Sequence, residues 1–438
     1  MKRRKFLAAS AAVATVPCFH IGAAESANEK LNVGIIGSGG RGRSNLGGVA
    51  GAGQNIYALC DIYDGPINAA AKKFPQAKRY YDWRELVADP AIDAVVVSTA
   101  DHHHALASIA AMRAGKHVYC EKPLAHTVRE ARAMQDEYAK VKGKVATQMG
   151  TQIHATNNYR RVVELVKGGA VGTVQEVHVW CSRGIRGVDQ AVLPAVEKPA
   201  DFHWDVWLGP AADRAYNPGY WKGGNLNWNR RWEFGNGVLG DMGSHLIDLP
   251  FWALDLHRPT SVVAEGPAPD PIGCPPWQVI TWEHPARGDR AALKLVWYHG
   301  TEGMKRRSER LQSLVGKDAN LSKWGNGICF IGSDGVLTAD YGKKVLSPSA
   351  KFKDFNAPKP SVAPSLGHYK EWIAACKGGT ESLCNFNYSG ALIEHNLLGN
   401  VAFRAGGKLD WNADTMTATP PAAAAFIDKT YRDGWGII

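Results

Sequence analysis

Short apolar runs alternate with helical spacing in the first third of the chain. The runs are LNVGII, NIYALC, DAVVVS, HVYC and KVATQM, and β-branched residues are frequent in them. Helical spacing covers residues 105–114 and 128–138, and Asp82 with Glu85 fits a capping box that opens a shorter helix. Regular alternation of strands and helices is typical of a parallel sheet built from βαβ units. We therefore predict a doubly wound α/β domain over residues 31–155.

The pattern changes from about Asn157 onward. A helical stretch, NNYRRVVELVKGG, precedes TVQEVHVWCS, in which alternating residues are typical of a half-buried strand. The later runs SVVAEG, QVITWEH, AALKLVWYH, GICFIGS and GVLTADY are typical of antiparallel strands, and helical stretches at 367–377 and 388–404 follow them. We predict a second, α+β domain over residues 156–411, and a tail over residues 412–438 that packs on the domains.

One long segment of the second domain shows no clear periodicity. Residues 184–235 are rich in Gly, Pro, Trp, Arg and Asn. A segment of this length is too long for a simple connection, and such segments are commonly lids or binding loops. We therefore predict a functional loop or lid here.

The N-terminus, MKRRKFLAASAAVATVPCFHIGAA, is a basic cluster followed by a short apolar run and small residues. This pattern is typical of a cleaved targeting peptide, which with a short linker covers residues 1–30. Arg3 and Arg4 before Phe6 resemble a twin-arginine signal, which directs folded proteins to export. We expect recognition by the twin-arginine (Tat) export machinery, cleavage near Ala24 and a periplasmic or other extracytoplasmic location. The alternative is a chance basic start before a buried helix.

Charge and cysteine content narrow the possible partners. Loss of the four basic residues before Ala24 lowers the formal net charge from +10 to +6, and no basic run remains, so nucleic acid is not an expected partner. No second apolar stretch approaches the ~20 residues needed to cross a bilayer, so no stable membrane anchor is expected. Seven of the eight cysteines remain after cleavage, and an odd number without a C-x-x-C pair argues against a disulfide framework and against zinc.

A glycine-rich turn follows the first apolar run. NVGIIGSGGRG places Gly37, Gly39 and Gly42 in G-x-G-x-x-G spacing between a strand and a helix. Such glycines allow a tight turn and close approach of the backbone to the pyrophosphate of a dinucleotide. Asp61 ends the next strand, where a carboxylate holds ribose hydroxyls and repels a 2′-phosphate, so NAD is favoured over NADP. The neighbouring Arg41 either softens this preference or starts a solvated helix.

Glu121, Lys122 and Pro123 come directly after the HVYC strand. Ligands of doubly wound sheets bind outside the carboxyl ends of the strands, so Lys122 is predicted to face a cofactor crevice. A partly desolvated ammonium group there can serve as an acid or base. The alternative is a surface lysine on a tight turn.

The segment GVLGDMGSHLIDLPFWAL places Asp241 and His245 four residues apart, hence on one face of a predicted helix, and Asp248 continues that face. The carboxylate can orient the imidazole while the ring reaches a substrate hydroxyl. A metal would need a third ligand, and none has convincing spacing, so no metal site is predicted. A simple helix-stabilising pair is the other alternative.

These segments together resemble the Gfo/Idh/MocA family of sugar and polyol oxidoreductases over nearly all of residues 31–438. GIIGSGGRG, EKP and GDMGSH carry the resemblance, in the expected order. It implies an N-terminal Rossmann domain and a C-terminal domain with a large open, mostly antiparallel sheet that often mediates homo-oligomers. It assigns the acid or base role to Lys122, and substrate contact to Asp241 and His245. The predicted cofactor contacts are Gly37, Ser38, Gly39, Arg41, Gly42, Asp61, Thr99, His104, Glu121 and Lys122.

Other residues near these segments are candidates for substrate contact. In STADHHHA, Thr99 closes a strand at the crevice and His104 opens a helix, whereas His102 and His103 are predicted to be solvent-facing caps. GTQIHATNNY departs from the basic segment of inositol dehydrogenases, and NLNWNRRWEFG suits sugar binding because aromatic faces cover C–H surfaces. The predicted substrate contacts are Gln152, His154, Tyr159, Trp228, Arg231 and Trp232, the last with the alternative of an aromatic core anchor.

The resemblance implies hydride transfer between a carbohydrate hydroxyl carbon and nicotinamide, with Lys122 or His245 removing the hydroxyl proton and Asp241 positioning His245. An exported enzyme meets little free NAD, so we expect a tightly bound and recycled NAD or NADP. One alternative is redox-neutral glycoside cleavage through a 3-keto intermediate. Another is a catalytically silent carbohydrate-binding protein.

Overall fold

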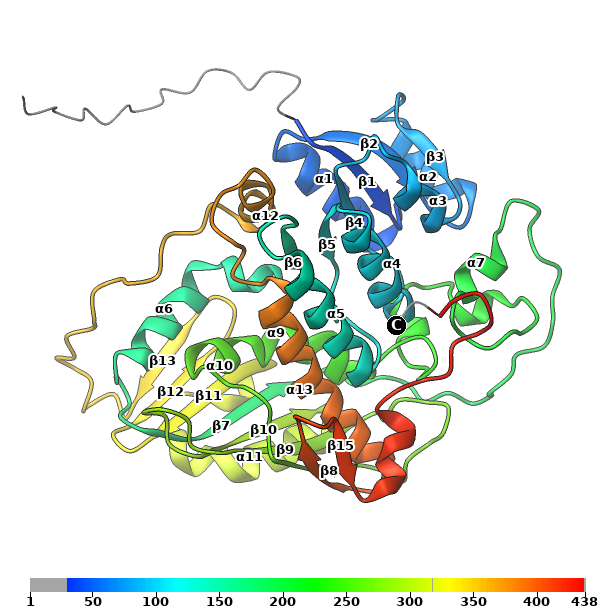
Figure 1. Ribbon diagram of the computed structural model, residues 1–438. Coiled ribbons are helices and arrows are strands. Elements are labelled where there is room, and N and C mark those ends of the chain that lie inside the picture. The colour runs from blue at the N-terminus through cyan, green and yellow to red at the C-terminus, as the bar shows by residue number, and fades with distance from the viewer. Residues whose placement is uncertain (1–29, 317, 437–438) are drawn as a thin grey trace, which may run out of the picture.

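The computed structural model describes residues 30–316 and 318–436, so the predicted signal peptide lies outside the described residues. Two sheets organise the chain (Figure 1). The first is parallel throughout, with the strand order β3-β2-β1-β4-β5-β6. Its strands are β1 (Asn32–Ile36), β2 (Asn55–Cys60), β3 (Lys78–Tyr80), β4 (Ala94–Val97), β5 (His117–Cys120) and β6 (Thr147–Met149).

The strand order of the first sheet reverses between β1 and β4, and ligands of open α/β sheets bind at such a reversal. The doubly wound prediction is therefore confirmed. Asp82 caps a short helix as predicted, since its carboxylate accepts from the Arg84 amide at 2.8 Å, but the described residues show no return hydrogen bond from Glu85, so the predicted capping box does not form. The helices of this part are α1 (Gly40–Gly51), α2 (Asp64–Ala71), α3 (Trp83–Ala88), α4 (Asp101–Arg113) and α5 (Val128–Val141).

The second sheet has nine strands within the described residues, in the order β13-β12-β11-β7-β10-β9-β8-β14-β15. Every pair is antiparallel except β7 with β10, which confirms the mostly antiparallel prediction. Its strands are β7 (Val174–Cys181), β8 (Ser261–Glu265), β9 (Gln278–His284), β10 (Leu293–His299), β11 (Asn326–Gly332), β12 (Val336–Ala339), β13 (Lys344–Ser347), β14 (Lys408–Asn412) and β15 (Thr417–Thr419).

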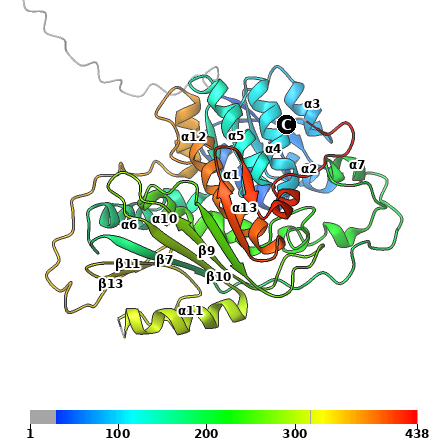
Figure 2. The ribbon, with the colours of Figure 1, turned by 60° about the horizontal axis from the view of Figure 1, so that its bottom comes forward.

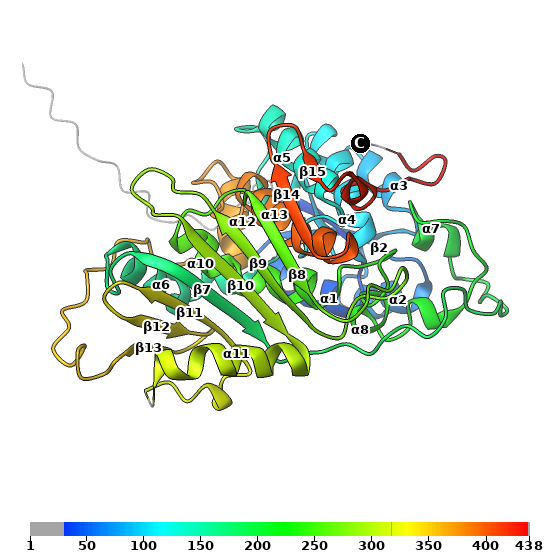
Figure 3. The ribbon, with the colours of Figure 1, turned by 90° about the horizontal axis from the view of Figure 1, so that it is seen from below.

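Helices cover both faces of this sheet. The helix α11 (Gly300–Val315) lies across the outer face, as Figures 2 and 3 show, and Leu311 and Val315 pack there against Trp180. The prediction that β7 is half-buried is therefore wrong, because α11 also buries Trp180 and His178. The inner face carries α6 (Asn157–Lys167), α10 (Asp248–Ala253) and α13 (Phe386–Arg404).

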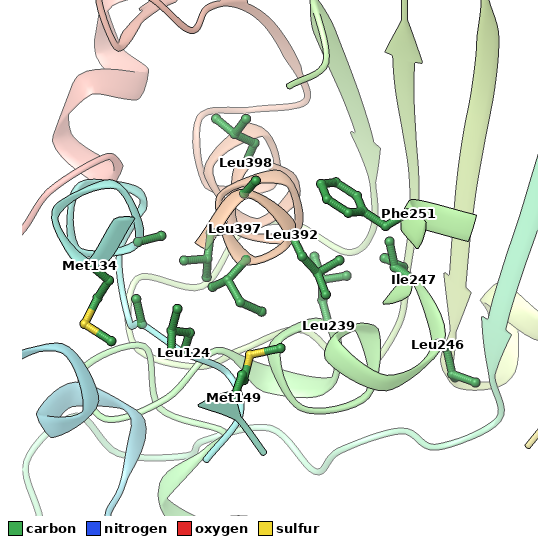
Figure 4. Packing of buried hydrophobic residues seen from close by; sticks show 14 of the residues in the cluster. Leu124, Met134, Met149, Leu239, Leu246, Ile247, Phe251, Leu392, Leu397 and Leu398 are labelled. Atoms are coloured by element: carbon green, nitrogen blue, oxygen red, sulfur yellow. The ribbon is translucent and has the colours of Figure 1, made fainter. Parts of the chain in front are cut away.

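One apolar core joins the two sheets. Figure 4 shows Met149 from the first sheet beside Leu239 and Leu392, which belong to the second half of the chain. The helix α12 (His368–Cys376) returns to the first sheet, where Trp372 is fully buried. The remaining helical turns are η2 (Gln152–Ala155), α7 (Trp204–Leu208), η3 (Pro218–Tyr220), α8 (Asn225–Trp228), η4 (Leu239–Gly243), α9 (Ser244–Leu246), η5 (Leu321–Lys323) and η6 (Pro421–Phe426).

The tail after β15 packs on the first domain, where Trp435 lies 5.7 Å from His103, centroid to centroid. None of the described helices has the length and apolar character of a membrane span.

Candidate active site

A cleft of about 890 Å³ opens at the carboxyl ends of β1, β2, β4 and β5. Its opposite wall comes from the second domain. Eleven residues that the sequence nominated line it: Gly37, Gly39, Arg41, Asp61, Thr99, Glu121, Lys122, Gln152, Trp228, Asp241 and His245. Residues far apart in the sequence thus meet at the place that doubly wound topology specifies.

The glycine turn fits a dinucleotide pyrophosphate. Gly37 has a φ of +82°, and a Cβ on Gly42 would lie 1.7 Å from the Gly37 carbonyl oxygen. Gly39 is the N-cap of α1 and has no side chain to satisfy the first amides of that helix. These amides stand beside the cleft, where an anion can accept their hydrogen bonds. The hydroxyl of Ser38 instead points behind the turn and donates to the Cys60 carbonyl at 3.1 Å.

Asp61 braces this turn. One carboxylate oxygen accepts from the amides of Ser38 and Gly39 at 2.8 and 3.1 Å, and the other accepts from the Ile62 amide. Burial raises the pKa of Asp61 to about 6, although these three hydrogen bonds act in the opposite direction. Asp61 also lines the cleft. Its contact with the ribose of a dinucleotide stays a prediction.

Glu121 connects α1 to the end of β5. Its Oε1 accepts from Arg41 Nε at 2.9 Å and from Asn45 Nδ2 at 3.0 Å. A Cβ on Gly150 would lie 2.7 Å from the Glu121 carboxyl carbon, so this glycine makes room for the carboxylate. The charge of Arg41 is thus paired within the protein.

Asp241 lies between two cations. Lys122 Nζ donates to Asp241 Oδ1, and Arg183 Nη1 donates to Asp241 Oδ2 at 2.5 Å. Burial disfavours the ionised carboxyl, but the charges of Lys122 and Arg183 outweigh it and lower the pKa of Asp241. Arg183 was not among the predicted site residues. The sequence feature that could have identified Arg183 is the one that identified Lys122. Each is a basic residue two positions after the end of a strand, Arg183 after β7 and Lys122 after β5.

The segment that carries Asp241 differs from the regular helix predicted for it. Residues of η4 form a π-helical turn, a form that is frequent at functional sites. Both Asp241 oxygens are taken by Lys122 and Arg183, and within the described part of the chain no hydrogen bond joins Asp241 to His245. In the structure, Asp241 therefore binds the two cations, and it does not position His245 as predicted.

His245 is a buried, neutral imidazole. Burial and the nearby Lys122 charge lower its pKa to about 3, with Asp241 acting in the opposite direction. Thr151 Oγ1 lies 3.5 Å from His245 Nδ1 and donates its own proton to the Ser244 carbonyl at 3.1 Å. The Thr151 oxygen is therefore left to accept from Nδ1, which assigns the unprotonated position to Nε2.

The three histidines at the start of α4 are buried. His104 braces the cleft from behind, with Nδ1 2.6 Å from the Pro123 carbonyl and Nε2 3.1 Å from the Thr99 carbonyl. The prediction that His102 and His103 face solvent is wrong, since they are 1% and 4% exposed. Both rings hydrogen-bond the Trp207 carbonyl, because the irregular segment of the second domain covers this end of α4.

Four predicted substrate contacts lie away from the cleft lining. Tyr159 donates to the His245 carbonyl at 2.9 Å and so supports the site from behind. His154 binds Asp248 at 2.9 Å and stacks on Trp252. The other two belong to the packing of the irregular segment: Arg231 donates to the Gln190 carbonyl, and Trp232 donates to the Asp270 carbonyl, which agrees with the core-anchor alternative.

The described residues contain no cluster of three or more His, Cys, Asp or Glu side chains suited to a metal ion.

Two family models match the chain. The model described as "Oxidoreductase family, NAD-binding Rossmann fold" matches residues 31–149, and "Oxidoreductase family, C-terminal alpha/beta domain" matches residues 157–293. Inositol 2-dehydrogenase of Salmonella typhimurium is 32% identical over 151 residues, 34% of this chain and 45% of the relative. Levoglucosan dehydrogenase of Pseudarthrobacter phenanthrenivorans is 28% identical over 244 residues, 50% of each chain. The chain thus spans about half the length, or slightly less, of these curated relatives.

Solved structures show the same fold. The WlbA dehydrogenase from Bordetella pertussis, in complex with NADH and UDP-GlcNAcA, aligns with a TM-score of 0.61 at 18% identity and covers 88% of this chain and 100% of its own. A levoglucosan dehydrogenase complex with NADH and L-sorbose aligns with a TM-score of 0.57 at 19% identity, covering 87% and 98%. The chain therefore belongs to the Gfo/Idh/MocA oxidoreductase family and has its NAD-binding Rossmann fold.

Proposed function

We propose that the protein transfers hydride between a hydroxyl-bearing carbon of a sugar or polyol and NAD. The observation that carries this proposal is the meeting of Lys122, Asp241, Arg183 and neutral His245 in the cleft that begins at the glycine turn. The sugar-type substrates named for the relatives above support the substrate class.

Bound NAD supplies the nicotinamide ring that accepts or returns the hydride. The groups of this chain then have to manage the hydroxyl proton and the charge on its oxygen. We assign the proton acceptor to His245 Nε2, because Nδ1 is directed at Thr151 and leaves Nε2 free. The ammonium of Lys122 donates a hydrogen bond to the same oxygen and stabilises its developing negative charge. The proposal thus favours His245 over Lys122 as the base.

Asp241 and Arg183 act on Lys122. The Asp241 carboxylate is the counter-ion of the buried ammonium, and Arg183 fixes the rotation of that carboxylate by holding its second oxygen. With His245 neutral, the two cations and one carboxylate leave one net positive charge at the reacting oxygen. That charge favours loss of the hydroxyl proton.

We further propose that the NAD stays bound between turnovers, in an enzyme exported by the twin-arginine route. Arg3 and Arg4 support export, and a cleft that has walls from both domains supports retention. A bound cofactor must be reoxidised in place, so a second sugar, or a later step on the same sugar, returns the hydride.

The test is to purify the mature protein, denature it and identify the released nucleotide. Sugars, polyols and aryl glycosides are then screened by product analysis, because a retained cofactor produces no free NADH. Lys122→Ala is expected to retain the nucleotide and to lose turnover at least a hundredfold. Unchanged turnover in Lys122→Ala contradicts the proposal, and a protein that binds neither NAD nor NADP contradicts it as well.

A further inference from the structure

A segment of the second domain reaches back to the first domain. We call residues 202–228 the strap; they contain α7, η3 and α8. In Figures 1 and 2 this segment, labelled at α7, lies next to the first domain. Its apolar residues form a cluster of their own, separate from the main core, and Phe202, Trp204, Trp207 and Tyr220 are among its members.

The strap docks on the loop that follows Asp61. Tyr63 stacks on Phe202, with ring centroids 5.5 Å apart, and lies 5.6 Å from Trp221. The ring of His203 stacks on Tyr81 at 4.5 Å, and its backbone amide donates to the Ile62 carbonyl at 2.8 Å. Three ring contacts and one backbone hydrogen bond therefore hold the strap to this edge of the first domain.

The docked strap is also a wall of the cleft. Trp221, Lys222 and Trp228 line the same cavity as the glycine turn and Asp61. The carboxylate at the end of the second strand marks the adenosine ribose end of a dinucleotide site, so the strap lies at the adenosine end and the Lys122 group at the other. The indole Nε1 of Trp221 has no hydrogen-bond partner among the residues described.

The strap also brings a cation to this wall. Lys222 is exposed and has no ion-pair or hydrogen-bond partner for its ammonium within residues 30–316 and 318–436. The dinucleotide carries two phosphates, and the amides at the start of α1 contribute only partial positive charge. A full positive charge from the second domain complements them.

We propose that the strap is a second wall of the dinucleotide site, and that NAD leaves only when the strap separates from Tyr63 and Tyr81. The proposal rests on the dinucleotide binding put forward under the proposed function. It assigns cofactor retention to a contact between domains, in addition to the glycine turn.

The experiment measures NADH dissociation from the full mature protein. The protein is loaded with NADH and chased with excess NAD, and the loss of bound-NADH fluorescence is followed. His203→Ala and Phe202→Leu weaken docking without altering a residue of the cleft lining. Each is expected to accelerate dissociation roughly 3- to 10-fold, the range of one aromatic pair. The matched control is Val192→Ala, at a side chain that is 69% exposed on the same irregular segment.

Lys222→Gln separates the charge of the strap from its docking. This variant is expected to dissociate faster at low salt and to show a weaker dependence on salt than the parent protein. Circular dichroism on each variant checks the fold, and His203→Ala, at an exposed residue, is expected to stay folded even if Phe202→Leu does not.

Equal dissociation rates for His203→Ala, Lys222→Gln and the control overturn the strap proposal. That outcome leaves hydride transfer intact, provided that the parent protein binds NADH and turns over a sugar. Failure of the parent protein to bind NADH defeats the proposed function itself.

Discussion

Replacing Arg183 by glutamine tests the arrangement around Asp241 without altering Lys122 or His245. The change removes a charge-assisted hydrogen bond of 2.5 Å to Asp241 Oδ2 and leaves the buried carboxylate with Lys122 as its remaining cation. Hydrogen bonds to charged groups contribute about 1.5–3 kcal/mol. The Arg183 side chain is 42% exposed, so solvent screening places the loss near the lower end, at about 1–2 kcal/mol.

A loss of about 1–2 kcal/mol corresponds to a fall of roughly 5- to 30-fold in kcat/KM. We expect most of this fall in kcat, because Arg183 acts by holding Asp241, and Asp241 in turn holds Lys122 at the reacting oxygen. The variant is also expected to raise the pKa of Asp241, since one of the two charges that lower it is gone. The acid limb of the pH–rate profile should therefore shift to higher pH.

The assay compares initial rates of Arg183→Gln, Arg183→Lys and Arg186→Gln with a confirmed substrate at several pH values. Arg183→Lys keeps a charge and should recover part of kcat. Arg186→Gln is the matched control, because Arg186 is an exposed residue three positions further along that does not line the cleft. Rates of Arg183→Gln equal to those of the control would refute the positioning role, and a rise in KM alone would reassign Arg183 to substrate binding.

Three further changes test other parts of the structure. Thr151→Val removes the acceptor of His245 Nδ1 and should lower kcat about tenfold with NADH affinity unchanged, whereas an unchanged kcat contradicts the assigned tautomer. Gly42→Ala should abolish NADH binding, measured by fluorescence titration, because its Cβ would lie 1.7 Å from the Gly37 carbonyl oxygen. His395 Nε2 lies 3.2 Å from His284 Nε2, and burial lowers the pKa of His395 to about 4. As pH falls from about 6.5, the imidazole is therefore protonated in the unfolded chain before it is protonated in the folded protein. Urea titrations should show up to about 3 kcal/mol of stability lost between pH 6.5 and 4, and a pH-independent midpoint would refute this.

The parts of the site that were predictable are those whose chemistry is local. The glycine spacing follows from a φ of +82° at Gly37 and from the absence of room for a Cβ at Gly42. Lys122 was predictable because parallel strands end at the same edge of a sheet, so a residue after β5 must lie near the residues after β1 and β2. Such arguments need topology but no knowledge of long-range packing.

The errors arose where packing partners come from distant segments. His102 and His103 were placed in solvent because polar residues at a helix start are commonly caps, yet a carbonyl more than a hundred residues away binds both rings. The spacing of Asp241 and His245 fits an α-helix as well as a π-helical turn, so the sequence could not show that Asp241 points to Arg183. In both cases the deciding partner lies after β7, either within residues 184–235, which carry no periodic signal, or directly before them.

The same irregular segment explains why the two domains of the cleft depend on each other. Arg183, directly before this segment, holds Asp241, which pairs with Lys122 of the first domain, and the strap within the segment docks on Tyr63 at the adenosine end. A dinucleotide bound between these contacts adds bridges from the first domain to the second. A ligand that binds more tightly when the strap is docked than when it is undocked stabilises the docked state, and the gain equals the difference between the two binding free energies. Thermal unfolding of His203→Ala should therefore recover towards the parent midpoint when NADH is added, and a deficit that NADH leaves unchanged would mean that the strap and the cofactor do not interact.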